Sequence, residues 1–146
     1  PGDPAATPEF VAQMWRTYFL RMAELARTGL YDVCSHFDIA KRCGIHAPPA
    51  LLAEIAPPTL DAVAAAGMAV EINTSGFNHG AAEAYPSLQI LVWMKERGIP
   101  IVFGSDAHNP DQIGQHFERA VDLARAAGYS QRASFRRRKK TLVPIG

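Results

Sequence analysis

The chain has 146 residues, of which 48% are hydrophobic and 20% charged, and its 15 Lys and Arg against 14 Asp and Glu leave a net charge of +1. This is the ordinary composition of a single compact domain, here residues 1–146. No apolar run approaches the roughly 18 residues that cross a bilayer, so a membrane-spanning segment is excluded.

Hydrophobic periodicity predicts helices that alternate with short strands. Thr7 is expected to cap the first helix, which has Pro8 in its first turn and stops at Gly29. Further helical segments are predicted at residues 49–55, 59–66, 86–97 and about 111–127. Strands are predicted at residues 31–35, 68–72 and 99–103, with a further short one at 141–145. This alternation predicts βαβ units and a parallel sheet.

Polar residues follow three of the predicted strands at the point where each strand ends. These clusters are Ser35 to Asp38, Glu71 to Ser75 and Gly104 to His108. Open α/β sheets and β/α barrels place their active sites beyond the carboxyl ends of parallel strands. We therefore expect the three strand ends to form one site.

The Gly104 to His108 segment carries the strongest local signal for chemistry. Asp106 and His108 are separated by one residue at a strand end, so a carboxylate oxygen and an imidazole nitrogen are available to a divalent metal. The spacing is equally compatible with an aspartate that caps the next helix beside an exposed histidine.

The other two strand ends leave several interpretations open. His36 ends the first predicted strand, where a histidine with a purely structural role is common, and Asp38 either orients its imidazole or serves a neighbouring loop. Glu71 and Asn73 share one face of their strand. The buried carboxylate of Glu71 needs a partner, and the candidates are a metal, a metal-ligating histidine and Lys41.

A basic pair on the loop after the first strand is a candidate phosphate site. Lys41 and Arg42 are able to hold a phosphate dianion, and the alternative is an ordinary exposed pair. Among the remaining histidines only His79 is expected near the site. His46 falls in a Pro-rich loop, and His116 falls inside the last predicted helix.

Six of the basic residues lie in the last fifteen positions, where there is no acidic residue, so the other 131 residues carry a net charge of −5. Clusters of this kind bind polyanions in some proteins but are more often solvated chain ends, and here Phe135 is the one interleaved aromatic residue. Nucleic acid is therefore not the favoured partner.

Several chemistries lack their sequence motifs. Cys34 and Cys43 match neither a disulfide framework nor a common zinc spacing, and we interpret both as reduced thiols of a cytoplasmic protein. There is no Gly-rich phosphate loop, dinucleotide fingerprint, nucleophile elbow or CxxC pair. Of the chemistries considered, metal-assisted hydrolysis is the one whose residues are present in the sequence.

The strand-end motifs resemble the PHP (polymerase and histidinol phosphatase) superfamily, and within it the histidinol-phosphatase branch. The matching segments keep the family's order and approximate spacing over nearly the whole chain: Tyr31 to Arg42, Val70 to Gly76, Glu83 to Ser87 and Gly98 to His108. The resemblance implies the C-terminal part of a distorted (β/α)7 TIM-like barrel with parallel strands. It also implies divalent metal ions, usually zinc, manganese or iron, that activate water to attack a phosphate monoester.

By the same resemblance, the implied metal ligands are His36, Asp106 and His108, and Arg42 contacts the substrate phosphate. Further candidates for binding the phosphate are Lys41, Ser75 and His79. Asp106 and His108 are also candidate catalytic residues for passing a proton to the leaving alkoxide, although we prefer the ligand role.

The chain departs from the family pattern in two places. The family's His-x-His motif, second histidine motif and metal-bridging Glu are expected upstream of Pro1. A barrel of this type needs about 250 residues, so we expect a C-terminal half whose exposed strand edges pair with the missing N-terminal half or with a second copy. Phe77 to His79 stand where the family commonly has Arg or Lys, and His79 replaces that contact only in part.

The favoured hypothesis is a metal-dependent phosphomonoester hydrolase that converts histidinol phosphate to histidinol and phosphate in histidine biosynthesis. One alternative is a non-catalytic fragment or remnant that oligomerises. The other is a PHP-type nuclease module that uses the basic tail, but the Asn73 to Gly76 and Glu83 to Ser87 segments favour the branch acting on small phosphorylated substrates.

Overall fold

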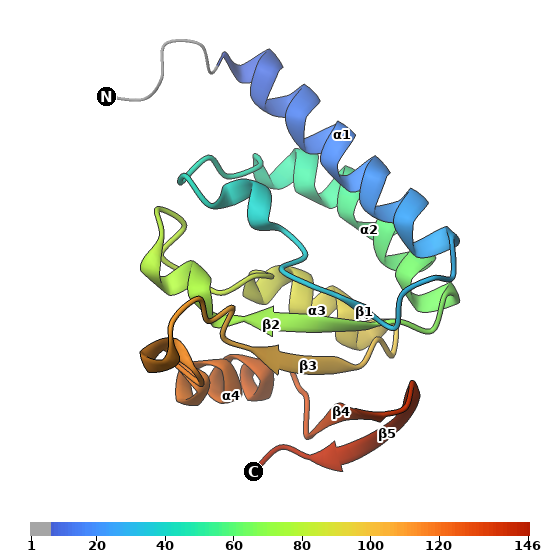
Figure 1. The fold of residues 1–146 in the computed structure, drawn as a ribbon. Coiled ribbons are helices and arrows are strands. Elements are labelled where there is room, and N and C mark those ends of the chain that lie inside the picture. The colour runs from blue at the N-terminus through green and yellow to red at the C-terminus, as the bar shows by residue number, and fades with distance from the viewer. Residues whose placement is uncertain (1–6) are drawn as a thin grey trace.

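The computed structural model describes residues 7–146, which form an α/β arrangement around a three-stranded parallel sheet (Figure 1). The helices and strands follow in the order α1 (Pro8–Arg27), β1 (Val33–Cys34), α2 (Pro49–Ala65), β2 (Ala69–Asn73), α3 (Leu88–Glu96), β3 (Ile101–Gly104), α4 (Phe117–Ala126), β4 (Gln131–Arg136) and β5 (Lys139–Pro144). Short 3-10 helices cover Ile39–Lys41, Thr74–Asn78 and Pro110–Gln112. The predicted α/β class and parallel sheet are confirmed.

The sheet has the order β1-β2-β3, and α2 and α3 make the crossovers between its strands. Val33 pairs with Ala69, and the β2–β3 ladder ends with Asn73 opposite Gly104. Because all three strands run in the same direction, their carboxyl ends meet at one edge, as the sequence predicted.

The first helix begins and ends where the sequence indicates. The Thr7 hydroxyl accepts a hydrogen bond from the backbone N–H of Phe10 at 3.2 Å, and Pro8 occupies the first turn, where its missing N–H costs nothing. Trp15 and Phe19 are buried on the face that packs against the core, and α1 lies along α2 (Figure 1). This packing holds the first helix against the rest of the fold.

The second helix is continuous, and the prediction of two separate segments was wrong. Pro57 and Pro58 lie inside α2 and remove two backbone hydrogen-bond donors, which by local rules ends a helix. Tertiary packing overrides that rule, because Ala56 and Leu60 are fully buried on both sides of the prolines. The Thr59 hydroxyl also donates to the carbonyl of Phe19 in α1 at 3.0 Å.

The last predicted helix begins later than expected, at Phe117. His116 precedes it with a left-handed φ of 57°, and Gly114 has a φ of 74°, so the chain turns sharply where a helix was predicted. The predicted strand at 141–145 exists as β5, but it pairs antiparallel with β4 in a hairpin that was not predicted. The hairpin is a second, two-stranded sheet.

The buried core lies between the sheet and its helices and includes Phe37, Leu60, Ile72 and Met94. Within residues 7–146, the structure contains no helix with the length and hydrophobicity of a membrane span.

Both cysteines are free thiols, with Cys34 buried and Cys43 exposed. Burial raises the pKa of the Cys34 thiol to about 12, so the reactive thiolate is scarce at pH 8. We expect a thiol reagent at pH 8 to modify one cysteine per native chain and two after denaturation. The Cys43→Ser variant should show no rapid reaction, and two rapid equivalents in the native chain would contradict the buried position of Cys34.

Candidate active site

A cavity of about 280 Å³ opens beyond the carboxyl ends of the sheet strands. It is lined by residues from loops far apart in the sequence: Arg42, Ser75, Asn78, His79, Asp106, His108, Gln112 and Gln115. Of the seven residues predicted to form the site, five line this cavity, and the other two, His36 and Lys41, do not.

Two candidate residues have an uncommon backbone conformation. His36 follows β1 with a φ of 32°, and Asp106 follows β3 with a φ of 50°. A non-glycine residue in the left-handed region costs about 1 kcal/mol or more, and such residues concentrate at functional sites. The surrounding structure holds both residues there at the end of their strands.

The Asp106–His108 pair occupies the cavity together. The Ser75 hydroxyl contacts Asp106 Oδ2 at 3.2 Å, and His108 Nδ1 lies 2.8 Å from the Asp106 carbonyl oxygen. The backbone N–H of His108 donates to Gln112 Oε1 at 2.8 Å. Because Nδ1 is engaged, the other ring nitrogen of His108 is the one left for a ligand.

Glu71 connects the ends of the outer strands. Its Oε2 accepts the backbone N–H of His36 and the side-chain N–H of Asn73, each at 3.0 Å. Its carboxylate also lies against Gly104, where a Cβ would stand 2.6 Å from Glu71 Cδ. Of the side-chain partners expected for this carboxylate, Lys41 pairs with Asp38 and Glu83 instead, and the donors that Glu71 Oε2 contacts are a backbone N–H and an amide.

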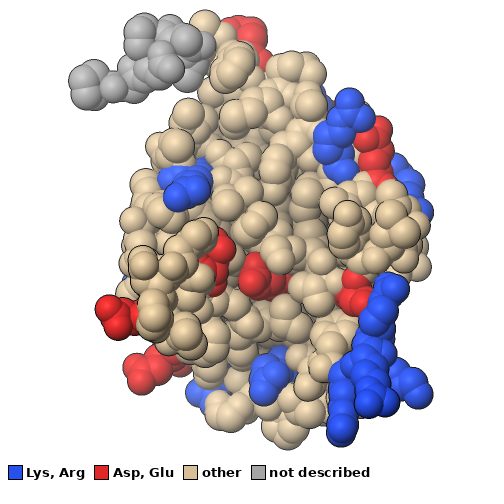
Figure 2. Space-filling model, in the orientation of Figure 1, with Lys and Arg blue, Asp and Glu red and all other residues tan. Residues whose placement is uncertain are grey.

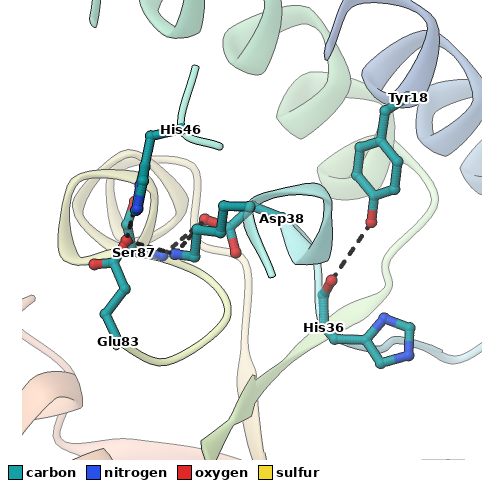
Figure 3. A network of polar contacts seen from close by, with 7 residues as sticks. Tyr18, His36, Asp38, His46, Glu83 and Ser87 are labelled. Carbon is teal, nitrogen blue, oxygen red and sulfur yellow. Dashed lines mark hydrogen bonds and ion pairs between the residues drawn. The ribbon is translucent and has the colours of Figure 1, made fainter. Parts of the chain in front are cut away.

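The imidazole of His36 is turned away from Asp38 (Figure 3). His36 Nδ1 is buried without a hydrogen-bond partner in the described residues, while the His36 carbonyl lies 3.5 Å from the Tyr18 hydroxyl. Burial raises the pKa of Tyr18, so this hydroxyl stays a donor. His36 does not line the cavity, and Asp38 does not orient it.

The structure places Lys41, a predicted phosphate contact, outside the cavity lining. Its ammonium is buried and lies 2.8 Å from both Asp38 Oδ2 and Glu83 Oε1. Asp38 also accepts the backbone N–H of Ser87 at 3.1 Å, so it serves a neighbouring loop. Burial raises the pKa of the Asp38 carboxyl, and the adjacent ammonium opposes that rise. The geometry directs Lys41 at carboxylates and not into the cavity.

Three amide side chains of the cavity were missed by sequence reasoning. Gln115 donates to the Ser105 carbonyl at 3.1 Å and accepts from Asn78 at 2.9 Å. His116, predicted inside a helix, contacts Asn78 Oδ1 through Nε2 at 2.9 Å. Gln112 is the third amide. No motif in the sequence indicates these residues, because Asn78 and Gln115 are far apart in the chain and only the tertiary fold brings them together.

The donor set fits a metal only in part. A carboxylate and an imidazole share the cavity, and His36 contributes a buried ring nitrogen without a partner, which suits a ligand. Across residues 7–146, however, no three His, Cys, Asp or Glu side chains converge closely enough to hold a metal ion. The described residues do not complete a metal site by themselves.

Comparisons with known proteins bear on the same segments. The family model described as PHP-associated matches residues 88–128, which include Asp106 and His108. A Deinococcus radiodurans protein named "Probable histidinol-phosphatase" is 39% identical over 140 residues, which cover 90% of this chain and 52% of that protein. A Schizosaccharomyces pombe protein of the same name is 40% identical over 50 residues, 34% of this chain and 16% of its own length. The chain thus spans about half the length of the Deinococcus relative.

Proposed function

With its resemblance to the histidinol-phosphatase branch of the PHP superfamily confirmed, we propose that this chain is the C-terminal part of a metal-dependent phosphomonoester hydrolase. The observation that carries the proposal is the convergence of Arg42, Ser75, His79, Asp106 and His108 on one cavity. A guanidinium, a hydroxyl and an imidazole suit a phosphate dianion, and the Asp–His pair suits a divalent metal.

In this proposal each side chain has a defined task. Arg42 binds the phosphate through its guanidinium fork, and Ser75 and His79 contact the remaining phosphoryl oxygens. Asp106 and His108 would supply two ligands to a metal. His36, the third ligand that the resemblance implies, lies outside the cavity and does not converge with them within residues 7–146, so the remaining ligands would come from elsewhere. The bound metal, whether zinc, manganese or iron, would supply an activated water.

We further propose that residues 1–146 are a single partial domain of a (β/α)7 barrel and that the remaining metal ligands come from outside it. β1 pairs with β2 on one side, and its other edge carries no paired strand within residues 7–146. An open edge of this kind pairs with another strand. Its partner is the N-terminal half of the barrel or a second copy of the chain.

The nuclease alternative is less well supported because of where the basic residues lie. Figure 2 shows Lys and Arg gathered at one corner of the molecule, over the β4–β5 hairpin of Figure 1. Within that hairpin, Arg138 donates to Asp32 at 2.8 Å, and Lys140 donates to the Gly67 carbonyl at 2.7 Å. Asp32 and Gly67 precede β1 and β2, so the basic cluster lies at the opposite end of the sheet from the cavity.

The proposal is tested by supplying the other half of the barrel. The chain would be co-expressed with the N-terminal half of the Deinococcus relative, stripped with a chelator and reconstituted with zinc, manganese or iron. Phosphate release would be measured from histidinol phosphate and p-nitrophenyl phosphate, and cleavage of single-stranded DNA would be measured in parallel. We expect metal-dependent phosphate release that is highest with histidinol phosphate.

In that assay, Arg42→Ala is expected to raise KM by about tenfold or more, because a charge-assisted contact to phosphate is lost. Arg125→Ala is the matched control, since Arg125 is exposed and donates only to the Gly146 carbonyl at 2.8 Å. DNA cleavage without phosphate release would favour the nuclease. A stable homo-oligomer that shows neither activity would favour the non-catalytic fragment.

A further inference from the structure

We propose that Lys41 is a positioning residue for Arg42: it fixes the loop after β1 against residues 80–87, so that the Arg42 guanidinium is presented to a phosphate in the cavity. The inference rests on the proposed function, but it concerns a residue that lies outside the cavity lining.

The first observation is a buried ammonium shared between two segments of the chain. The side chains of Lys41 and Asp38 are each 3% exposed, and Glu83 reaches the same ammonium from the 80–87 segment. A buried charge is expensive unless it is paired, so separating these segments would leave charges without partners. The three side chains therefore act as a clamp.

Asp38 adds a second link between the same two segments. Its Oδ2 accepts the backbone N–H of Ser87 as well as the ammonium of Lys41. The Lys41 ammonium also lies 5.5 Å from the centre of the Tyr85 ring, within range of a cation–π contact. The clamp thus holds the chain at residues 83, 85 and 87.

Backbone contacts continue this attachment as far as Arg42. The Arg42 carbonyl accepts the N–H of Ala81 at 3.2 Å. Gly80 packs so closely on the loop that a Cβ there would lie 3.0 Å from the Cys43 carbonyl carbon and 3.1 Å from Gly44 N. The backbone of Arg42 is therefore packed against residues 80–81, which are next in the chain to the segment that the clamp holds.

The consequence for binding is entropic. Arg42 is exposed and has a long side chain, so ordering its rotamers on phosphate already costs free energy. If the backbone were also mobile, that mobility would have to be lost on binding. Fixing the loop beforehand removes this second cost.

Two readouts test the inference on the whole chain. A nitroxide spin label on the exposed Cys43 reports loop mobility, because Cys34 is buried and stays unlabelled. Titration calorimetry with inorganic phosphate reports the affinity of the cavity. We expect Lys41→Met to increase the mobility of the label and to weaken phosphate binding by about three- to tenfold, a smaller loss than for Arg42→Ala.

Thr59→Val controls for general loss of stability, since it removes a buried hydrogen bond to Phe19 far from the clamp. It should lower Tm without changing either readout. If Lys41→Met does not fold, Glu83→Gln weakens one arm of the clamp from a side chain that is 38% exposed, and it should shift both readouts in the same direction.

An immobile label and unchanged phosphate affinity in the Lys41 and Glu83 variants would overturn the inference. If the wild-type chain and Arg42→Ala are alike in failing to bind phosphate, the proposed phosphate site is wrong. The spin label then decides separately whether Lys41 fixes the loop.

Discussion

Replacing Gly76 with alanine is expected to lower the free energy of unfolding by about 3 kcal/mol, which is at the upper end for overpacking a well-filled interior. Gly76 is buried in the turn after β2. An added Cβ would overlap the backbone carbonyl oxygen of Glu83 and would stand 3.0 Å from Tyr85 Cζ. A backbone carbonyl cannot rotate away as the end of a side chain does, so either the turn or the 83–85 segment has to move.

Gly29→Ala is the matched control for this prediction. Nothing lies within 4 Å of a Cβ at Gly29, whose φ of 66° is the only source of strain. Gly29→Ala should therefore lower the free energy of unfolding by about 1 kcal/mol. Urea denaturation of the two variants measures the difference, and equal losses would contradict the close contact at Gly76. Because Ser75 lines the cavity beside Gly76, the Gly76 variant should also weaken phosphate binding.

Asp106→Asn is expected to reduce metal-dependent phosphate release from the reconstituted barrel by about a hundredfold or more, since substitutions even beyond the direct ligands of a metal cost about 10- to 100-fold. Asparagine keeps the shape of the side chain and an oxygen for the Ser75 hydroxyl, which lies 3.2 Å from Asp106 Oδ2. The fold should therefore persist while the negative charge is lost.

Asp61→Asn is the control, because Asp61 is an exposed carboxylate that pairs with Arg97 at 2.7 Å, away from the cavity. Elemental analysis of both variants separates loss of the metal from loss of chemistry. Near-normal turnover in Asp106→Asn would remove Asp106 from the site, whereas turnover lost with full metal content would favour its role as a proton donor.

The predictable parts of the fold are those set by local rules. The N-cap at Thr7 and the apolar stripe of α1 depend on neighbouring residues alone, and the structure follows them. The strands β1 to β3 were also predictable, since short apolar runs bounded by loops leave few alternatives. The β4–β5 hairpin was missed because its turn consists of Arg137 and Arg138, both left-handed, where glycine or asparagine is usual.

The sequence by itself determined the βαβ order and, because parallel strands end at one edge, that polar residues of the loops after the strands would gather there, as Arg42, Ser75 and Asp106 do. Tertiary structure alone decided what each polar side chain contacts. It kept α2 intact through Pro57 and Pro58, since burial on both sides outweighs two missing hydrogen bonds. It also directed Lys41 towards Asp38 and Glu83, because a buried ammonium is stabilised only when carboxylates pair with it. Which carboxylates are within reach depends on how distant segments of the chain pack.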